Sequence, residues 1–189
     1  MKDFEQNERR KAEIKARPLI DAVYNKIWKV KNITRADQQS DERLKYMDKY
    51  LHIDTIIELS DGEHINLQEK SLSYYFRDFN TVTLEYYNNP KTGELGDYFL
   101  CEAQAYFCGY LNENNTGFCK WWILDMIKLR ELIIKNGGIK WAEQFRQKNI
   151  YSGKADFFAF PVAYIWESVI HGYSKVIPPV HSRYKINVA

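Results

Sequence analysis

Hydrophobic residues recur at two different spacings along the chain, and these spacings predict helices first and strands next. Between positions 18 and 30 they fall three or four residues apart, as on one face of an α-helix; they are Leu19, Val23, Ile27 and Val30. Pro18 is expected in the first turn of that helix, where a missing N–H is tolerated. A second helix is expected before residue 51, with a buried side formed by Leu44, Met47 and Leu51.

Three later segments have the composition of β-strands. They are residues 51–59, 64–72 and 81–87, in which β-branched and apolar residues predominate or alternate with polar ones. Asp61-Gly62 separates the first two segments, and Asp-Gly is a strong signal for a tight hairpin turn. We therefore expect the three segments to form an antiparallel meander.

The second half of the chain predicts further helices and strands within the same domain. A helix, or a helix entered from a short strand, is expected over residues 97–111. The other expected helices cover residues 126–138, 139–149 and 161–172, and the expected strands cover residues 118–126 and 155–160. The domain is expected to span residues 18–177, between a charged arm or helix (1–17) and an extended tail (178–189).

Length and composition fit a single domain. The 189 residues are 45% hydrophobic, which is enough for a sizeable core. No apolar run approaches the roughly 18 residues of a membrane-spanning helix, and the charged N-terminus does not resemble a signal peptide, so we expect a cytoplasmic protein without a membrane partner. The net charge of +2 excludes a uniformly basic nucleic-acid binder.

Cysteine and histidine positions argue against several kinds of site. Cys101, Cys108 and Cys119 are odd in number and lack a CxxC spacing, which argues against a disulfide framework or a zinc knuckle. The four histidines form no HExxH pattern. The thiols are expected to be buried and free, and a cysteine hydrolase would find no obvious histidine partner for them.

Asp54, Gln68 and Lys70 form the main candidate site. Gln68 and Lys70 are two residues apart, so on a strand they share one face, and the hairpin turn can bring Asp54 beside that face. Carboxylate and amide oxygens are ligands that Mg²⁺ takes, and a nearby lysine can orient an attacking water. The trio therefore has the residue types needed for Mg²⁺- or Mn²⁺-assisted hydrolysis of a phosphodiester.

The same three residues can instead form the solvated side of an ordinary hairpin, which is a common arrangement. Against this alternative, Ile53 and Ile56 flank Asp54, and Leu67 precedes Gln68. Apolar residues on both faces indicate an internal strand. A lysine is rarely buried on such a strand unless it has a partner or a function, so the position of Lys70 favours a site.

The segments HID (52–54) and INLQEK (65–70) resemble the motif of the PD-(D/E)XK, or restriction-endonuclease-like, superfamily. The wider resemblance covers residues 40–170 and is to small phage and bacterial members. It implies an α/β (α+β) fold with a restriction-endonuclease-like core, in which helices flank a central mixed sheet containing an antiparallel three-strand meander. It also implies a Mg²⁺-dependent endonuclease acting on DNA in a host or bacterial cytoplasm, and a second copy of the chain as a further partner. Gln68 stands where most members carry Asp or Glu, which implies a weaker metal ligand.

Other acidic residues are candidates for the same site. Glu85, in the third expected strand, can supply a second carboxylate to the metal and take part in catalysis, or it can be an exposed acid opposite a lysine. Asp48 and Glu42 lie on the expected helix before Asp54, where superfamily members often place an acid, and a solvated helix face is the alternative for both. Glu58 is in phase with Asp54 but lies farther along its strand.

Lys120, Lys154 and Arg77 are candidate contacts to a nucleic-acid backbone. Lys120 can equally be one edge lysine of an apolar strand, and Lys154 follows a Ser-Gly pair that is too short to be a P-loop. Gln104 and Tyr106 resemble residues that some superfamily members place after the core, although core packing also explains Tyr106.

Two functions therefore stay open on the sequence alone. One is a metal-dependent DNA nuclease, and the other is a catalytically inactive module on the same fold that binds nucleic acid or protein. Gln68 and the near-neutral net charge motivate the second. The two differ in whether the chain cleaves DNA when Mg²⁺ or Mn²⁺ is supplied.

Overall fold

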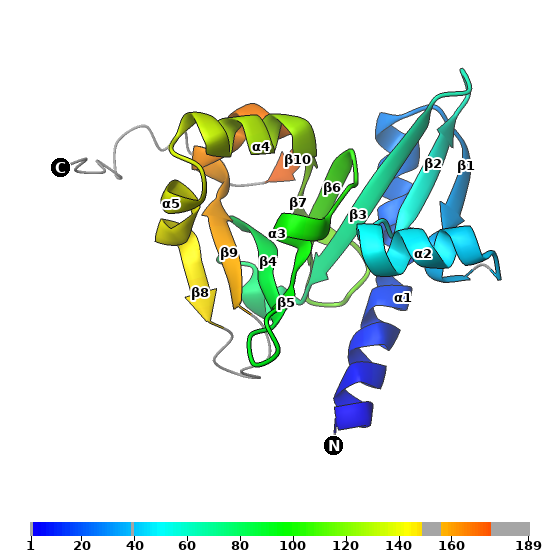
Figure 1. The fold of residues 1–189 in the computed structure, drawn as a ribbon. Coiled ribbons are helices and arrows are strands. Elements are labelled where there is room, and N and C mark those ends of the chain that lie inside the picture. The colour runs from blue at the N-terminus through cyan, green and yellow to red at the C-terminus, as the bar shows by residue number, and fades with distance from the viewer. Residues whose placement is uncertain (1, 39, 149–155, 175–189) are drawn as a thin grey trace.

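A computed structural model of the protein describes residues 2–38, 40–148 and 156–174, which fold into two β-sheets and several helices (Figure 1). The helices are α1 (Lys2–Ile27), α2 (Glu42–Leu51), α3 (Asp97–Leu100), α4 (Met126–Lys135) and α5 (Ile139–Ala142). The strands are β1 (Val30–Arg35), β2 (Thr55–Leu59), β3 (His64–Leu72), β4 (Thr81–Asn89), β5 (Glu94–Leu95), β6 (Ala105–Leu111), β7 (Phe118–Asp125), β8 (Arg146–Lys148), β9 (Asp156–Pro161) and β10 (Val169–Ser174).

The larger sheet is mixed and has the strand order β1-β2-β3-β6-β7-β10. All neighbours in it are antiparallel except β3 and β6, which are parallel. Gly62, with a φ of 89°, makes the tight turn between β2 and β3 that the Asp-Gly pair predicts. The protein is therefore a mixed α/β protein, and its central mixed sheet contains an antiparallel three-strand meander.

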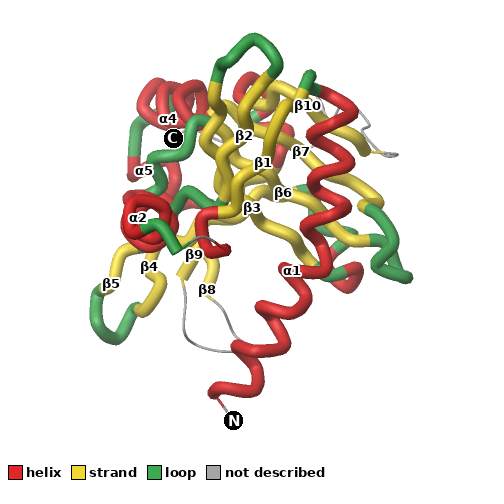
Figure 2. Tube along the Cα trace, turned by 90° about the vertical axis from the view of Figure 1, so that its right-hand side faces the viewer, coloured by secondary structure: helices red, strands yellow, loops and turns green. Residues whose placement is uncertain are grey.

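Both faces of the larger sheet are covered (Figure 2). Helix α1 lies on one face, where its Ile20 and Tyr24 pack with Leu67 and Phe107. The smaller sheet, of order β5-β4-β9-β8, lies on the opposite side together with α2 and α4. Because β3 and β6 are central strands between these layers, apolar side chains on both of their faces are buried.

The strands of the meander differ from the prediction. They are β1, β2 and β3, whereas the third predicted strand, β4, pairs with β9 in the smaller sheet. The other edge of β3 is taken by β6, which runs parallel to it from Leu67 to Leu72. The apolar residues of β4, Val82 and Leu84, are buried in the core between the layers instead. β1 itself was not predicted because its sequence is mostly polar, as is usual for an edge strand.

The predicted helix over residues 97–111 is wrong for most of its length. Only α3 is helical there, and β6 follows as a central strand in which every residue is buried. The apolar residues of such a strand face both layers, so their spacing loses the period of two that identifies a half-buried strand. This segment therefore has the composition of a buried helix as much as that of a strand.

The remaining predictions in the second half are confirmed in part. β7, α4 and β9 agree with the predicted strand, helix and strand. The segment predicted as a helix over 139–149 is shorter, because α5 gives way to a 3₁₀ turn and then to β8. Pro161 does not start a long helix: two 3₁₀ turns follow it, and the chain then extends into β10. The predicted tail at 178–189 lies outside the described residues.

The charged arm and the first predicted helix are one helix, α1, so that Pro18 lies well inside it rather than in its first turn. The residues before Pro18 extend the helix because Glu, Lys, Arg and Ala are strong helix formers. Crossing a bilayer would need a longer apolar helix than any found among the described residues.

Candidate active site

The candidate site lies where β2 and β3 run side by side. Thr55 pairs with Leu67 in this hairpin, so Asp54, the residue before β2, lies opposite Gln68. The Asp54 N–H donates to the Leu67 carbonyl at 2.9 Å, and the Glu69 N–H donates to Asp54 Oδ2 at 2.8 Å. The structure therefore brings Asp54 and Gln68 together and holds the Asp54 carboxylate through the backbone of β3.

The surroundings of Asp54 disfavour its charge. Burial raises the pKa of Asp54 to about 7, against the opposing effect of the hydrogen bond from the Glu69 N–H. The carboxylates of Asp48 and Asp97 lie near enough to act in the same direction as burial. A carboxylate placed in this way gains stability from a proton or from a metal cation.

The side-chain oxygen of Gln68 is a hydrogen-bond acceptor to which no described group donates. Its Oε1 is buried and finds no hydrogen-bond partner in the described part of the chain. Leaving such an atom unsatisfied costs about 1–3 kcal/mol. An amide oxygen is also a ligand for Mg²⁺ or Ca²⁺, so a cation between Asp54 and Gln68 would satisfy both groups.

Lys70 lies two residues beyond Gln68 on the same face of β3 and reaches the smaller sheet. Its Nζ donates to Glu85 Oε1 at 2.9 Å, and both side chains are about four-fifths buried. Of the two alternatives for Glu85, the structure shows an acid opposite a lysine. The side chain is partly buried, however, rather than exposed.

His52 and Asp97 form a second pair near Asp54, which the sequence pattern did not predict. His52 Nδ1 lies 2.6 Å from Asp97 Oδ1, and this hydrogen bond raises the pKa of His52. Asp97 is held there by a close approach of the chain to β4, because a Cβ on Gly96 would lie 2.4 Å from the carbonyl oxygen of Glu85. The only sequence signal for this pair is that glycine, directly before a buried acid.

Neither protein-family models, nor curated proteins, nor solved structures match this chain. Within the described ranges, no three His, Cys, Asp or Glu side chains are grouped closely enough to hold a metal by themselves. Asp54 and Gln68 would supply two oxygen ligands from the chain, and Mg²⁺ usually completes such a set with water and substrate phosphate. The desolvated carboxylate and the unsatisfied amide oxygen fit a hard cation.

The other acids considered on the sequence lie at different distances from this site. Asp48 is partly buried on α2 and acts electrostatically on Asp54. Glu42 is exposed and pairs with Lys45 at 2.7 Å. Glu58 pairs with Lys31 across the β1–β2 edge. Of the three, the structure brings Asp48 toward the site.

The three predicted backbone contacts have different positions. Lys120 is buried, and its Nζ donates to the Phe79 carbonyl and to Asn80 Oδ1, so it cannot reach a nucleic-acid backbone without leaving these partners. Arg77 is partly exposed; its guanidinium lies 4.0 Å from the centroid of the Tyr74 ring and pairs at 4.0 Å with the exposed Asp78. Lys154 lies outside the described residues.

Gln104 and Tyr106 have structural partners. Gln104 Oε1 accepts a hydrogen bond from the Asn66 N–H at 2.9 Å, which ties the start of β6 to β3. Tyr106 is fully buried, and its hydroxyl donates to the Thr83 carbonyl at 2.8 Å, so core packing explains it.

The thiols behave as expected for buried cysteines. Cys101 and Cys108 are free and buried, and Cys119 is free and partly buried. Burial raises the pKa values of Cys101 and Cys108 to about 12, which makes both poor nucleophiles near neutral pH.

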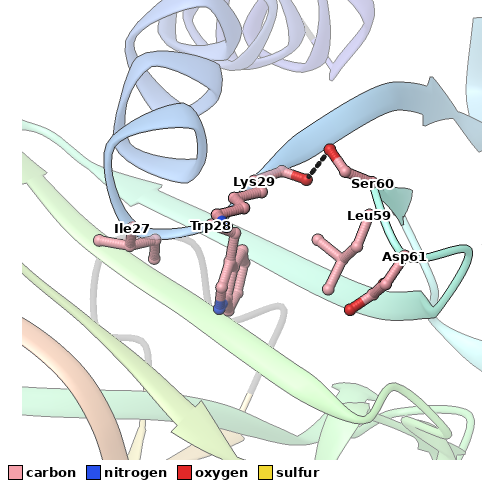
Figure 3. A pocket seen from close by; sticks show the side chains of 6 residues that line it. All are labelled: Ile27, Trp28, Lys29, Leu59, Ser60 and Asp61. Carbon is pink, nitrogen blue, oxygen red and sulfur yellow. Dashed lines mark hydrogen bonds between the residues drawn. The ribbon is translucent and has the colours of Figure 1, made fainter.

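A hollow of about 450 Å³ lies elsewhere, between the end of α1 and the β2–β3 turn (Figure 3). Trp28 and Leu59 line it, and Ser60 donates to the Lys29 carbonyl beside it. It is separated from Asp54 by the length of β2 and contains none of the candidate residues.

Proposed function

We propose that this protein is a metal-dependent nuclease that hydrolyses phosphodiester bonds of DNA, with Asp54, Gln68 and Lys70 in its active site. The observation that carries the proposal is a partly buried carboxylate with a raised pKa, opposite a residue whose buried amide oxygen has no partner among the described residues. Both lie on one face of an internal hairpin, and a lysine follows on that face.

The chain's own residues divide the chemistry as follows. Asp54 and Gln68 would hold Mg²⁺ or Mn²⁺, which when bound would lower the pKa of water and offset charge on the phosphate. Lys70 donates hydrogen bonds to the attacking water and to the phosphate through its ammonium group. Glu85 fixes that ammonium by the 2.9 Å ion pair, and we assign it as a positioning residue for Lys70.

The topology supports the finer assignment to a restriction-endonuclease-like core. A helix on one face, an antiparallel meander and a further strand parallel to β3 form the mixed sheet. The acidic residue precedes the second strand of that meander, and the Gln-x-Lys motif lies on the third. The acid, the turn and the Gln-x-Lys segment thus follow one another in the order of the superfamily motif that the sequence resembles.

A specific observation favours one alternative. The site contributes an amide where a second carboxylate would bind a metal more strongly, and no larger metal-ligating group occurs in the described residues. A catalytically inactive module that binds nucleic acid or protein on the same fold would tolerate such a site.

Cleavage of supercoiled plasmid and of single-stranded DNA with Mg²⁺ or Mn²⁺ tests the proposal. The wild type is expected to cut, Lys70→Ala and Asp54→Ala to lose at least about 10²-fold in rate, and Lys31→Ala, an exposed lysine of β1, to cut normally. A wild type that binds DNA but leaves it intact with either metal would overturn the proposal in favour of the inactive module.

A further inference from the structure

The connection between β3 and β4 presents unusually many aromatic rings to solvent. Within residues 73–80, the exposed fractions are 86% for Tyr75, 58% for Phe79 and 41% for Phe76. A fourth ring, that of Tyr74, is covered by the Arg77 guanidinium at 4.0 Å from its centroid. The rings of Phe76 and Phe79 lie 6.4 Å apart, so the exposed rings form a cluster rather than single scattered residues.

The backbone of this aromatic loop (residues 73–80) is held in one shape. Ser73 Oγ accepts from the Tyr75 N–H at 3.3 Å, and the Phe76 and Phe79 N–H groups donate to carbonyls three residues earlier. The buried ammonium of Lys120 holds the far end through the Phe79 carbonyl and Asn80 Oδ1. The rings are therefore presented by a preorganised loop, which lowers the entropic cost of binding.

The same loop connects the two strands that carry Lys70 and Glu85. Lys70 precedes Ser73 by three residues of extended chain, a span of about 10 Å. Glu85, the partner of Lys70 at 2.9 Å, follows the loop on β4. The ion pair thus joins the two strands that the aromatic loop connects, and the loop leaves β3 within about 10 Å of chain from Lys70.

We propose that the aromatic loop binds unpaired nucleotides of a nucleic-acid strand by stacking bases on Tyr75 and Phe79, with Arg77 beside the phosphate backbone. The inference rests on the proposed nuclease function and specifies its substrate as DNA with a single-stranded segment. Unpaired bases expose the faces that such rings bind, whereas duplex bases do not. The net charge of +2 also favours stacking over neutralisation of a long duplex backbone.

Fluorescence anisotropy with a labelled oligothymidine and with a duplex of equal length tests this directly. The measurements are made in EDTA, so that binding is read without cleavage. The wild type is expected to bind the single strand more tightly than the duplex. Combining Tyr75→Ala with Phe79→Ala is expected to weaken single-strand binding at least tenfold, because each stacked base contributes about that factor.

Two controls keep the test specific. Trp166→Ala removes a ring of comparable exposure, 48%, from a different surface and should leave the affinity unchanged. Tyr75→Phe keeps the ring and should retain binding. All substituted rings are exposed, so thermal unfolding should match the wild type.

The outcomes separate this proposal from that of catalysis. Ring-dependent binding by a protein that never cuts DNA supports the aromatic loop and rejects the nuclease. Cleavage that proceeds with equal single-strand affinity in wild type and double variant rejects the aromatic loop and supports the nuclease. With or without cleavage, equal single-strand affinity in the wild type and the double variant rejects the aromatic loop as a nucleic-acid contact.

Discussion

The two faces of β3 carry charged and polar residues in very different states. Glu69 points toward α1, where the Arg35 guanidinium and the Tyr24 hydroxyl both donate to its Oε1. Gln68 and Lys70 point toward the smaller sheet. There the Oε1 of Gln68 is buried and without a partner among the described residues.

On the α1 side the buried charges form a closed network. Arg35 donates to Glu69, to Asp21 and to the Thr55 hydroxyl, and both Arg35 and Glu69 are more than nine-tenths buried. Such a network fixes the register of β1, β2 and β3 and needs nothing from outside the chain. On the opposite side, Asp54 is partly buried and lies across the hairpin from Gln68, and its Oδ2 accepts a hydrogen bond from the Glu69 N–H.

Adjacent residues of one strand thus have different roles: we interpret Glu69 as structural and Gln68 as functional. A buried charge that is fully paired is explained by the fold. A buried acceptor that is left unsatisfied costs stability, so a cation or a water bound at Gln68 Oε1 would stabilise the fold. Substitutions on the two faces should accordingly have different effects.

The largest effect is expected from Arg35→Met. The substitution leaves Glu69 buried without its cation, which should lower the free energy of unfolding by about 3–5 kcal/mol. Lys31→Met, on the same strand, breaks an exposed pair with Glu58 and should cost at most about 1 kcal/mol. Urea denaturation of both variants measures this, and equal losses would show that the network is not the anchor of the hairpin.

A smaller change of opposite sign is expected from Asp54→Asn in the absence of metal. The amide keeps the acceptor for the Glu69 N–H and removes the buried charge. Because the folded pKa of Asp54 is raised to about 7, the charge destabilises the wild type fully above pH 7 and not below pH 4. The variant should be more stable by roughly 2–4 kcal/mol at pH 8, and the gain should disappear as the pH falls toward 4.

Thermal or urea unfolding across that pH range, in EDTA, checks the prediction. A gain of equal size at both ends of the range would mean that burial of charge is not its cause.

Tyr24→Phe should have the smallest effect of the three. It removes the 2.9 Å hydrogen bond to Glu69 but leaves the Arg35 pair, so we expect a loss of about 1–2 kcal/mol. Tyr46→Phe removes an exposed hydroxyl on α2 and should change stability by less than about 0.5 kcal/mol. A loss for Tyr24→Phe no larger than for Tyr46→Phe would remove Tyr24 from the network.

Short-range patterns predicted those parts of the fold that depend on neighbouring residues. The β2–β3 hairpin follows from Asp61-Gly62 and the flanking alternation, and α4 follows from its helical spacing. The partner of β4 and the strand β6 depend on contacts far apart in sequence, and the sequence pattern around Tyr106 is equally compatible with a buried helix. These long-range choices are made by the packing of the two layers.

The candidate site was predictable to the same extent. The period of two predicted Gln68 and Lys70 on one face, and the turn allowed Asp54 to lie beside that face; the structure sets it opposite Gln68. The electrostatic surroundings of Asp54 include Asp48 on α2 and Asp97 on α3, which no local pattern reveals. The His52–Asp97 pair joins residues 45 positions apart and was missed for the same reason.

The central claim is that Asp54 and Gln68 bind a divalent cation. Measuring thermal stability as a function of metal concentration tests this claim most directly. Melting temperatures are measured with increasing Mg²⁺ and Mn²⁺ for the wild type, Asp54→Asn, Gln68→Met and the surface control Lys31→Met. The melting temperatures of the wild type and Lys31→Met are predicted to rise as metal is added. At a metal concentration a hundredfold above the dissociation constant, the folded state should be stabilised by about 2.7 kcal/mol. The two site variants are predicted to show no such rise. A wild type that is indifferent to both metals, or site variants that respond as it does, would contradict the claim.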